Sequence, residues 1–137
     1  MVNPCSTFAY KRRTMNTTEF KEQLSQFIGT EQWHRWSALY PHWLLTDGAK
    51  FVADEARAYW LMDLLASYEN HPKTRHEYFQ VWKLTKDEQE WKVTCEDGNN
   101  HKLVTQRIKY SDFPLPEFDL WAIFDGDYWV ILLASEY

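Results

Sequence analysis

The spacing of apolar residues changes once along this chain, near residue 76, and this change constrains the fold most. Before it, apolar residues recur at intervals of three and four, as in the segment 20–28. After it, they alternate with polar residues, as in the segment 90–96. A period near 3.6 is typical of a helix buried on one side, and a period of 2 is typical of a half-buried strand. The sequence therefore predicts helices first and strands second.

Two helices are predicted in the first half. The first spans about 17–28, because Asn16 and Glu19 have the spacing of a capping box and Gly29 suits the residue that follows a helix. The second spans about 48–69 and is capped by Thr46 or Asp47. Its second half is apolar on nearly every side, which predicts burial on every side.

Between these helices, Thr30 is predicted to begin a short helical turn that carries Trp33 and Trp36. Pro41 would end this turn, because proline has no N–H to donate into a helix. Residues 43–45 are predicted to form a short extended or buried connector.

The second half predicts a five-stranded antiparallel meander over about 77–134, with the long helix packed on it, which is an α+β fold. The predicted strands are 78–84, 90–95, 101–110, 118–124 and 128–134. Residues 1–15 show no apolar periodicity and are expected to be a disordered extension. Residues 16–137 are then expected to form a single α+β domain, which suits a chain of this length.

The chain has more aromatic surface than a single helix layer on a sheet can bury. It contains eight Trp, eight Tyr and eight Phe, and residues 129–133 are apolar at consecutive positions. Consecutive apolar residues in a strand require burial on both faces of the sheet. Either the first helix and the segment around Trp33 and Trp36 cover the second face, or a second copy of the protein does. Because two-fold symmetry is the commonest way to cover such a surface, we predict a homodimer.

The distribution of charge excludes one class of partner. The net charge is −5, and residues 110–137 carry six acidic side chains and no basic one. Such a surface repels phosphate backbones, so we expect no nucleic-acid partner. An acidic inhibitor that presents its C-terminal hairpin to a basic partner is a further hypothesis.

The chain shows no signal for a membrane or for secretion. No apolar run is long enough to span a bilayer, and no apolar segment follows the basic residues 11–13 as it would in a secretory signal. Two cysteines are too few for a disulfide scaffold, and Cys95 alternates with apolar neighbours as a buried residue would. We therefore expect a cytoplasmic protein without a membrane partner.

Asp63 is the ionisable residue that stands out, because it interrupts the apolar half of the long helix. Burial would raise the pKa of its carboxyl toward the range useful for acid–base catalysis. The alternative is a structural carboxylate that bonds a Tyr, Trp or Arg partner. A small enzyme would use Asp63, helped by His42 or Tyr59, as its acid or base in an aromatic pocket.

A group of ring-bearing side chains flanks this position and could line a ligand pocket or pack as core. Its members are Trp33, Trp36, Tyr40, His42, Trp43, Tyr59 and Trp60. The sequence has no Cys-x-x-Cys, no Gly-x-Ser-x-Gly, no phosphate-binding glycine loop and no histidine pair at metal-ligand spacing. We therefore predict no metal and no cofactor, and we favour a non-enzymatic homodimer that binds a protein or small ligand through aromatic surface.

Four segments carry a resemblance to a known family: 29–33 (GTEQW), 46–56 (TDGAKFVADEA), 58–63 (AYWLMD) and 130–137 (VILLASEY). In these the chain resembles an uncharacterised family of small bacterial proteins from cyanobacterial, phage and other mobile-element genes. The resemblance covers about residues 16–137. It implies no activity, so no catalytic residue is carried over from it. Arg57 stands where the resemblance leads us to expect a small residue.

Overall fold

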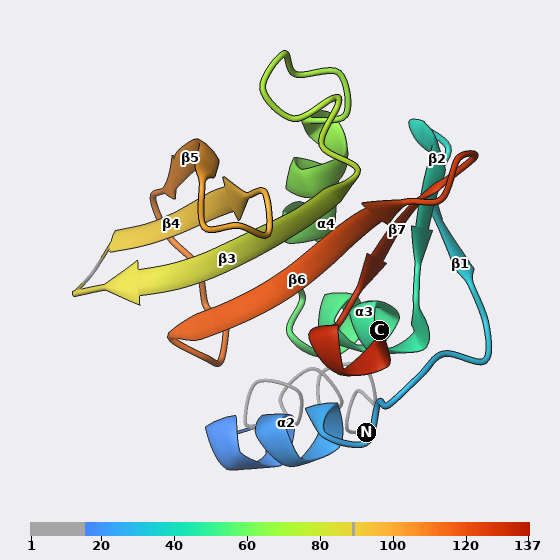
Figure 1. The fold of residues 1–137 in the computed structure, drawn as a ribbon. Helices are drawn as coiled ribbons and strands as arrows, with labels where there is room; N and C mark the ends of the chain where they lie inside the picture. Colours follow the sequence, from blue (N-terminus) through green and yellow to red (C-terminus); the bar gives the residue numbers. More distant parts are fainter. Residues whose placement is uncertain (1–15, 89) are drawn as a thin grey trace.

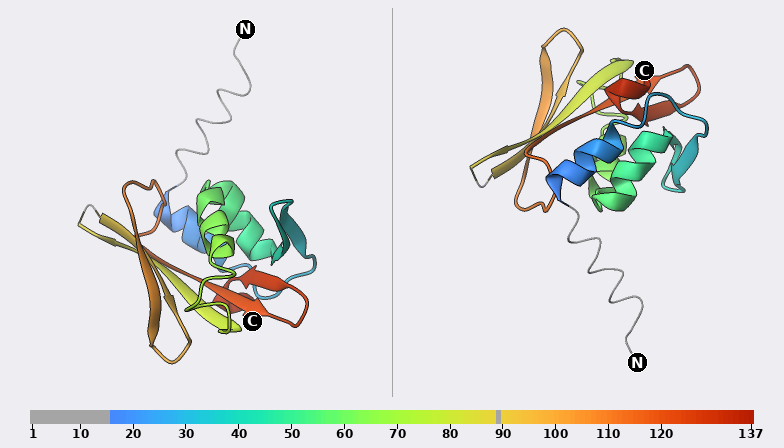
Figure 2. Two further views of the ribbon diagram at one scale, coloured as in Figure 1. Left: turned by 90° about the horizontal axis from the view of Figure 1, so that it is seen from above. Right: turned by 90° about the horizontal axis from the view of Figure 1, so that it is seen from below.

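The structure is a computed structural model that describes residues 16–88 and 90–137. The extension predicted for residues 1–15 lies outside the described residues. Within them, one twisted sheet carries all three α-helices on the same face (Figures 1 and 2). This arrangement is an α+β fold.

The elements follow one another in an order that begins with a helix and ends with a short 3-10 turn. They are α2 (Thr17–Leu24), β1 (His34–Ser37), β2 (Tyr40–Leu45), α3 (Asp47–Glu55), α4 (Tyr59–Ser67), β3 (Phe79–Asp87), β4 (Glu90–Glu96), β5 (Lys102–Ile108), β6 (Glu117–Phe124), β7 (Trp129–Leu132) and η1 (Ala134–Glu136).

The predicted five-stranded antiparallel meander over 77–134 is wrong. The sheet has seven strands in the order β1-β2-β7-β6-β3-β4-β5, and β2 pairs with β7 in parallel. The alternation of residues did locate the strands β3 to β7, but β6 pairs with β3 rather than with β5. The sheet is therefore mixed, and its strands do not follow the order of the chain.

The two additional strands come from the segment that was predicted to be a helical turn and a connector. Residues 34–37 and 40–45 form a hairpin, in which Trp43 and Leu45 are buried. Pro41 is tolerated because the pairing of β1 with β2 shifts register between Arg35 and Ser37, and β7 pairs only with residues 43–45. Pro41 therefore lies inside a strand and ends no helix.

The connection between β5 and β6 explains why the strands do not form a meander. Phe113 and Leu115 are both about 5% exposed, so their side chains anchor this loop on the core. At its end, the backbone N–H of Lys86 donates to Pro116 O at 2.8 Å and starts the β3–β6 ladder. Burial of two large apolar side chains thus carries the chain across the molecule to the far edge of β3.

The helices are shorter than predicted. α2 ends at Leu24 with Ser25 as its C-cap, so Gly29 does not terminate it. The long helix predicted over 48–69 is two helices, because the chain turns at Arg57, whose φ is 52°. The Ala58 N–H donates to Ala53 O at 3.0 Å, which is the closing bond of a Schellman C-cap. Such a cap ends α3 and redirects the chain into α4.

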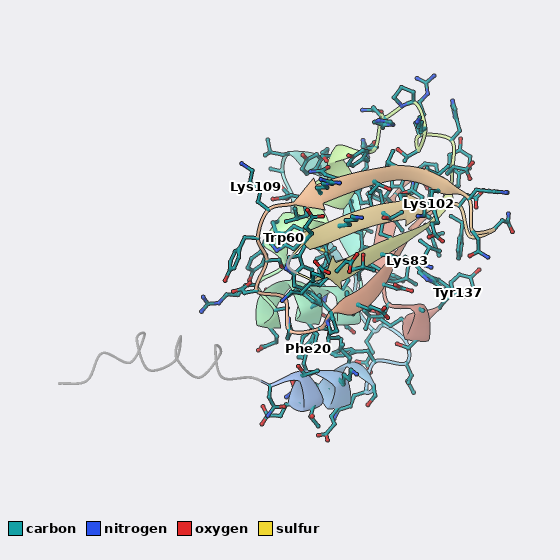
Figure 3. All side chains as sticks on the ribbon, turned by 90° about the vertical axis from the view of Figure 1, so that its left-hand side faces the viewer. Phe20, Trp60, Lys83, Lys102, Lys109 and Tyr137 are labelled. Atoms are coloured by element: carbon teal, nitrogen blue, oxygen red, sulfur yellow. The ribbon has the colours of Figure 1, made fainter. Side chains whose placement is uncertain are left out.

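The core lies between the helices and the sheet. Trp82, Trp91 and Trp129 point from the sheet toward the helices and are at most 4% exposed. Phe20, labelled in Figure 3, is fully buried and joins α2 to this core. The first helix therefore covers the same face of the sheet as the others and does not cover the second face.

Candidate functional site

Asp63 lies on the exposed side of α4, so the burial expected for it does not occur. Its Oδ1 accepts a hydrogen bond from the indole Nε1 of Trp36 at 2.8 Å. Trp36 comes from β1, an edge strand of the sheet, and its indole reaches α4 in the helix layer. The structure therefore gives Asp63 a tryptophan partner at the surface.

Trp36 also stacks on Tyr59, one helical turn before Asp63. The two ring centroids are 5.8 Å apart and the planes are within 10° of parallel. The Tyr59 hydroxyl donates to Asp54 Oδ1 at 2.7 Å, and Asp54 pairs with Lys50 at 2.6 Å. We call Trp36, Tyr59, Asp54 and Asp63 the aromatic–acid cluster.

Local sequence explains why these four side chains meet. Tyr59 and Asp63 are four residues apart on one helix, so they lie on the same side of it. The turn at Arg57 brings the end of α3, with Asp54, next to the start of α4. Each ring donor therefore has a carboxylate acceptor, which fixes both rings at the surface.

The other predicted ring residues do not join this cluster. Trp43 is 1% exposed, stacks on Trp129 at 5.2 Å and donates its Nε1 to a Glu69 oxygen at 2.7 Å, so it belongs to the core. Tyr40 and Trp60 are half-buried against that core. Trp33 is 59% exposed in the segment before β1.

His42 and Asp63 are not brought together. Adjacent residues of a strand point to opposite faces, so His42 points away from the helix layer into which Trp43 is buried. The His42 ring lies near Tyr128, with 6.4 Å between ring centroids. The Tyr59 hydroxyl donates to Asp54 rather than to Asp63. The geometry therefore suits binding by rings and carboxylates better than proton transfer.

The segment that leads into β1 is held on the start of α3. Asp47 accepts from the backbone N–H of Glu31 at 2.9 Å and contacts His34 Nε2 at 2.9 Å. These bonds hold the pKa of the Asp47 carboxyl below its ordinary value, and the bond from the Glu31 backbone N–H has the largest effect. Thr46, rather than Asp47, is the N-cap, because its hydroxyl accepts from Ala49 N. These bonds fix the position of the start of β1, the strand that carries Trp36.

Other chemistries find little support in the part of the chain that the structure describes. There, no three His, Cys, Asp or Glu side chains come close enough together to hold a metal ion. Burial raises the pKa of the Cys95 thiol to about 12, which keeps it protonated and a poor nucleophile. None of the helices in residues 16–88 and 90–137 is both long and apolar enough to cross a bilayer.

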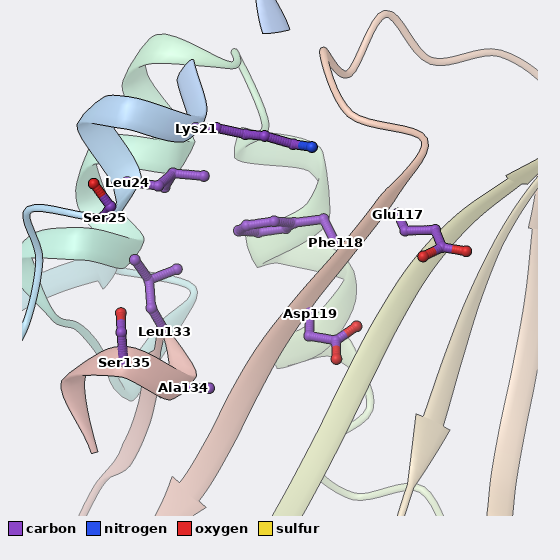
Figure 4. A pocket seen from close by; sticks show the side chains of 9 residues that line it. All are labelled: Lys21, Leu24, Ser25, Glu117, Phe118, Asp119, Leu133, Ala134 and Ser135. Atoms are coloured by element: carbon purple, nitrogen blue, oxygen red, sulfur yellow. The ribbon is translucent and has the colours of Figure 1, made fainter. Parts of the chain in front are cut away.

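Sequence reasoning missed a groove of about 500 Å³ between α2, β6 and η1 (Figure 4). Its lining residues are Lys21, Leu24, Ser25, Glu117, Phe118, Asp119, Leu133, Ala134 and Ser135. They come from three segments that are far apart in the sequence. Its signal in the sequence is the pair of carboxylates, Glu117 and Asp119, that flank Phe118 at the start of a strand.

Comparison with known proteins gives a fold and a family. No curated protein matches the chain. One solved structure, described as a protein of unknown function from Enterococcus faecalis, aligns with a TM-score of 0.55 at 14% identity, over 77% of this chain and 98% of that one, so the two share a fold. Residues 18–137 match a family of unknown function, DUF6876, in agreement with the resemblance found over about 16–137. This match covers most of the sequence, and the chain therefore belongs to the DUF6876 family.

Proposed function

We propose that this protein is a binding module rather than an enzyme, and that its aromatic–acid cluster takes a cationic segment of a protein partner. The observation that carries the proposal is the stacked Trp36–Tyr59 pair, whose two ring donors are each bonded to a carboxylate at the surface. Tyr59 is 45% exposed, so part of the pair is accessible to a ligand.

The chemistry of the cluster favours a cation. An Arg or Lys side chain is attracted to the face of Trp and Tyr, by about 0.5–2 kcal/mol depending on desolvation. The Asp63 side chain lies beside the rings and offers carboxylate oxygens to a cation. The net charge of −5 would also attract a basic partner over longer distances at low salt.

Replacing Trp36 by alanine is expected to weaken binding of a short oligo-arginine peptide about tenfold, since it removes both the ring face and the donor that holds Asp63. Asp63→Asn should weaken binding less, because the rings remain. Titration calorimetry at low salt measures both effects, with an oligo-glutamate peptide as the charge control. Trp33→Ala is the matched variant: it removes an exposed indole three residues away and should leave the affinity within about twofold. Equal losses in both tryptophan variants would contradict the proposal.

We further propose that the protein is a homodimer in the bacterial cytoplasm, as the resemblance to bacterial and phage proteins and the aromatic content suggested. Support comes from the sheet face opposite the helices, where the rings of Phe79, Trp121 and Tyr137 contact one another with centroids 5.0–6.0 Å apart. Tyr137, labelled in Figure 3, is 77% exposed. Sedimentation velocity is expected to give twice the monomer mass, and a single monomeric species at high concentration would contradict the dimer.

A further inference from the structure

Among the described residues, the first half of β6 has no neighbouring strand on one side. β7 pairs with residues 121–124 of β6, whereas β3 pairs with residues 117–123. After Leu132 the chain leaves the sheet and forms η1 instead of continuing beside β6. The groove of Figure 4 lies along this open edge, between α2, β6 and η1. At about 3.3 Å per residue, residues 117–120 offer about 13 Å of edge to an added strand.

The hydrogen-bond register shows which backbone groups of β6 face the groove. Phe124 N donates to Tyr78 O at 2.9 Å, so the even-numbered residues of β6 exchange hydrogen bonds with β3. The N–H and C=O groups of Glu117 and Asp119 consequently point the other way, toward the groove. Within residues 16–88 and 90–137, no strand pairs with them on that side. An extended peptide that adds to a sheet edge uses backbone groups of this kind.

The helix side of this edge is apolar. Phe118 points from β6 toward the helices, where Leu24 and Leu133 line the groove (Figure 4). Lys21 of α2 extends over the same side. Its charge disfavours a second cation there, so this side suits an apolar side chain of a bound segment.

The opposite side of the edge carries an excess of negative charge. Glu117 and Asp119 point to it, as alternation along a strand requires. Their register partners on β3 are Thr85 and Lys83, and Lys83 also pairs with Glu96 at 3.4 Å. Burial and the charges of the other two carboxylates raise the pKa of Asp119, although Lys83 opposes the rise. The three carboxylates therefore share Lys83, and a further cation brought beside them is attracted.

We propose that this edge binds an extended segment of a protein partner in which two basic side chains flank an apolar one. The segment adds a strand antiparallel to β6, which continues the pairing that β7 already makes with β6. Its two basic residues lie opposite Asp119 and Glu117 and exchange backbone hydrogen bonds with them. Its central residue lies opposite Phe118 and packs against Leu24 and Leu133.

This edge and the aromatic–acid cluster are built from different elements. The cluster comes from β1, α3 and α4, whereas the groove lies between α2, β6 and η1. The cluster recognises a cation, and the edge recognises an extended backbone together with alternating side chains. A test of the edge must therefore separate backbone pairing from attraction between charges.

Amide hydrogen exchange on the full chain, resolved by NMR, tests the inference with the end-blocked peptide Thr-Arg-Leu-Arg-Thr. The Asp119 amide should exchange rapidly in the protein alone, and about tenfold more slowly with peptide at about ten times its dissociation constant. The Leu120 amide bonds to β3 and should exchange slowly in both samples. Slow exchange at Asp119 in the protein alone would overturn the proposal, because the groove would then already be filled.

Methylation of single backbone amides in the peptide separates strand pairing from charge. In the antiparallel register the first arginine lies opposite Asp119, so its N–H faces β6. A methyl group on that nitrogen should weaken binding about tenfold, because it removes the donor and adds bulk at the edge. The leucine N–H points away from β6, so its methylation should change the affinity by no more than about twofold. Equal affinities of the two methylated peptides would overturn the added strand.

Charge reversal on the protein tests the register. Glu117→Lys should weaken binding of the peptide about fivefold. Glu90→Lys is the matched control, because Glu90 is also an exposed glutamate that begins a strand, and it should change the affinity by less than about twofold. A peptide whose second arginine is replaced by glutamate should bind Glu117→Lys more tightly than it binds the unmodified chain. Equal losses in the two protein variants would overturn the proposal.

Discussion

The substitution Gly48→Ala is expected to lower the free energy of unfolding by about 1–3 kcal/mol, although alanine is ordinarily the better helix former by about 1 kcal/mol. Gly48 is buried in the first turn of α3. A β-carbon on it would lie 2.5 Å from Glu136 Oε1 and 2.6 Å from Leu133 Cδ1. Both atoms lie at the ends of flexible side chains, so the Glu136 and Leu133 side chains must turn away from α3.

That movement removes several hydrogen bonds at once. The Glu136 carboxylate accepts from the Thr46 hydroxyl at 2.6 Å and from the backbone N–H groups of Gly48 and Leu133, both at 2.9 Å. It lies at the N-terminus of α3, where the helix dipole favours a negative charge. A carboxylate with three donors is thus the link between the last turn of the chain and the helix that leads to the aromatic–acid cluster.

Denaturant unfolding measures the effect, and the chain offers its own control. At Gly29 an added β-carbon meets nothing within 4 Å, so Gly29→Ala should change stability by no more than about 0.5 kcal/mol. In a Glu136→Ala background, Gly48→Ala should cost about 1 kcal/mol less than in the unmodified chain, because one of the two clashing side chains is gone and its hydrogen bonds are already lost. Equal costs in both backgrounds would show that Glu136 does not occupy this place.

The contact between Gly48 and Glu136 illustrates what the sequence could not predict. The residues are 88 positions apart, and each has a plausible local role, one in a first helical turn and one near a chain end. By contrast, strands β3 to β7 were predictable, since alternation of apolar and polar residues is a local property. Their pairing was not, because the β3–β6 ladder depends on a loop that is buried by Phe113 and Leu115.

The sequence did not predict the β1–β2 hairpin or the break between α3 and α4, for two different physical reasons. Pro41 argues against a strand unless the ladder is irregular beside it, and the bulge in β1 that permits it leaves no local pattern. Arg57 occupies a left-handed position that usually requires glycine. Helix propensity across 48–69 therefore predicted continuity where tertiary packing imposes a turn.

For the candidate site, the sequence predicted most of the side chains but not which of them contact one another. Trp36, Tyr59 and Asp63 were among the predicted residues and do meet. Asp54, which accepts from the Tyr59 hydroxyl, was not among the predicted site residues. From the sequence, Trp43 and Trp36 were equally good candidates for a pocket. Only the sheet topology shows that Trp43 lies in the core and Trp36 at the surface.

Trp43→Ala is accordingly expected to cost about 3–5 kcal/mol, the range for truncating a large buried aromatic side chain. The indole is 1% exposed, stacks on Trp129 with 8° between the planes and donates to Glu69. Trp43 and Trp129 are also register partners in the β2–β7 pair. Because this parallel pair joins the β1–β2 hairpin to the rest of the sheet, the loss weakens the attachment of the strand that carries Trp36.

Thermal and denaturant unfolding of Trp43→Ala beside Trp33→Ala measures this difference. Trp33 is 59% exposed, so its removal should change stability by less than about 0.5 kcal/mol. A folding free energy of about 5–15 kcal/mol is typical of one domain, so Trp43→Ala would remove a large part of it. If Trp43→Ala were as stable as Trp33→Ala, the Trp43 indole would not be packed against Trp129 of β7 and bonded to Glu69. The β1–β2 hairpin, whose strand β1 carries Trp36, would then be attached to β7 without the stacking of Trp43 on Trp129.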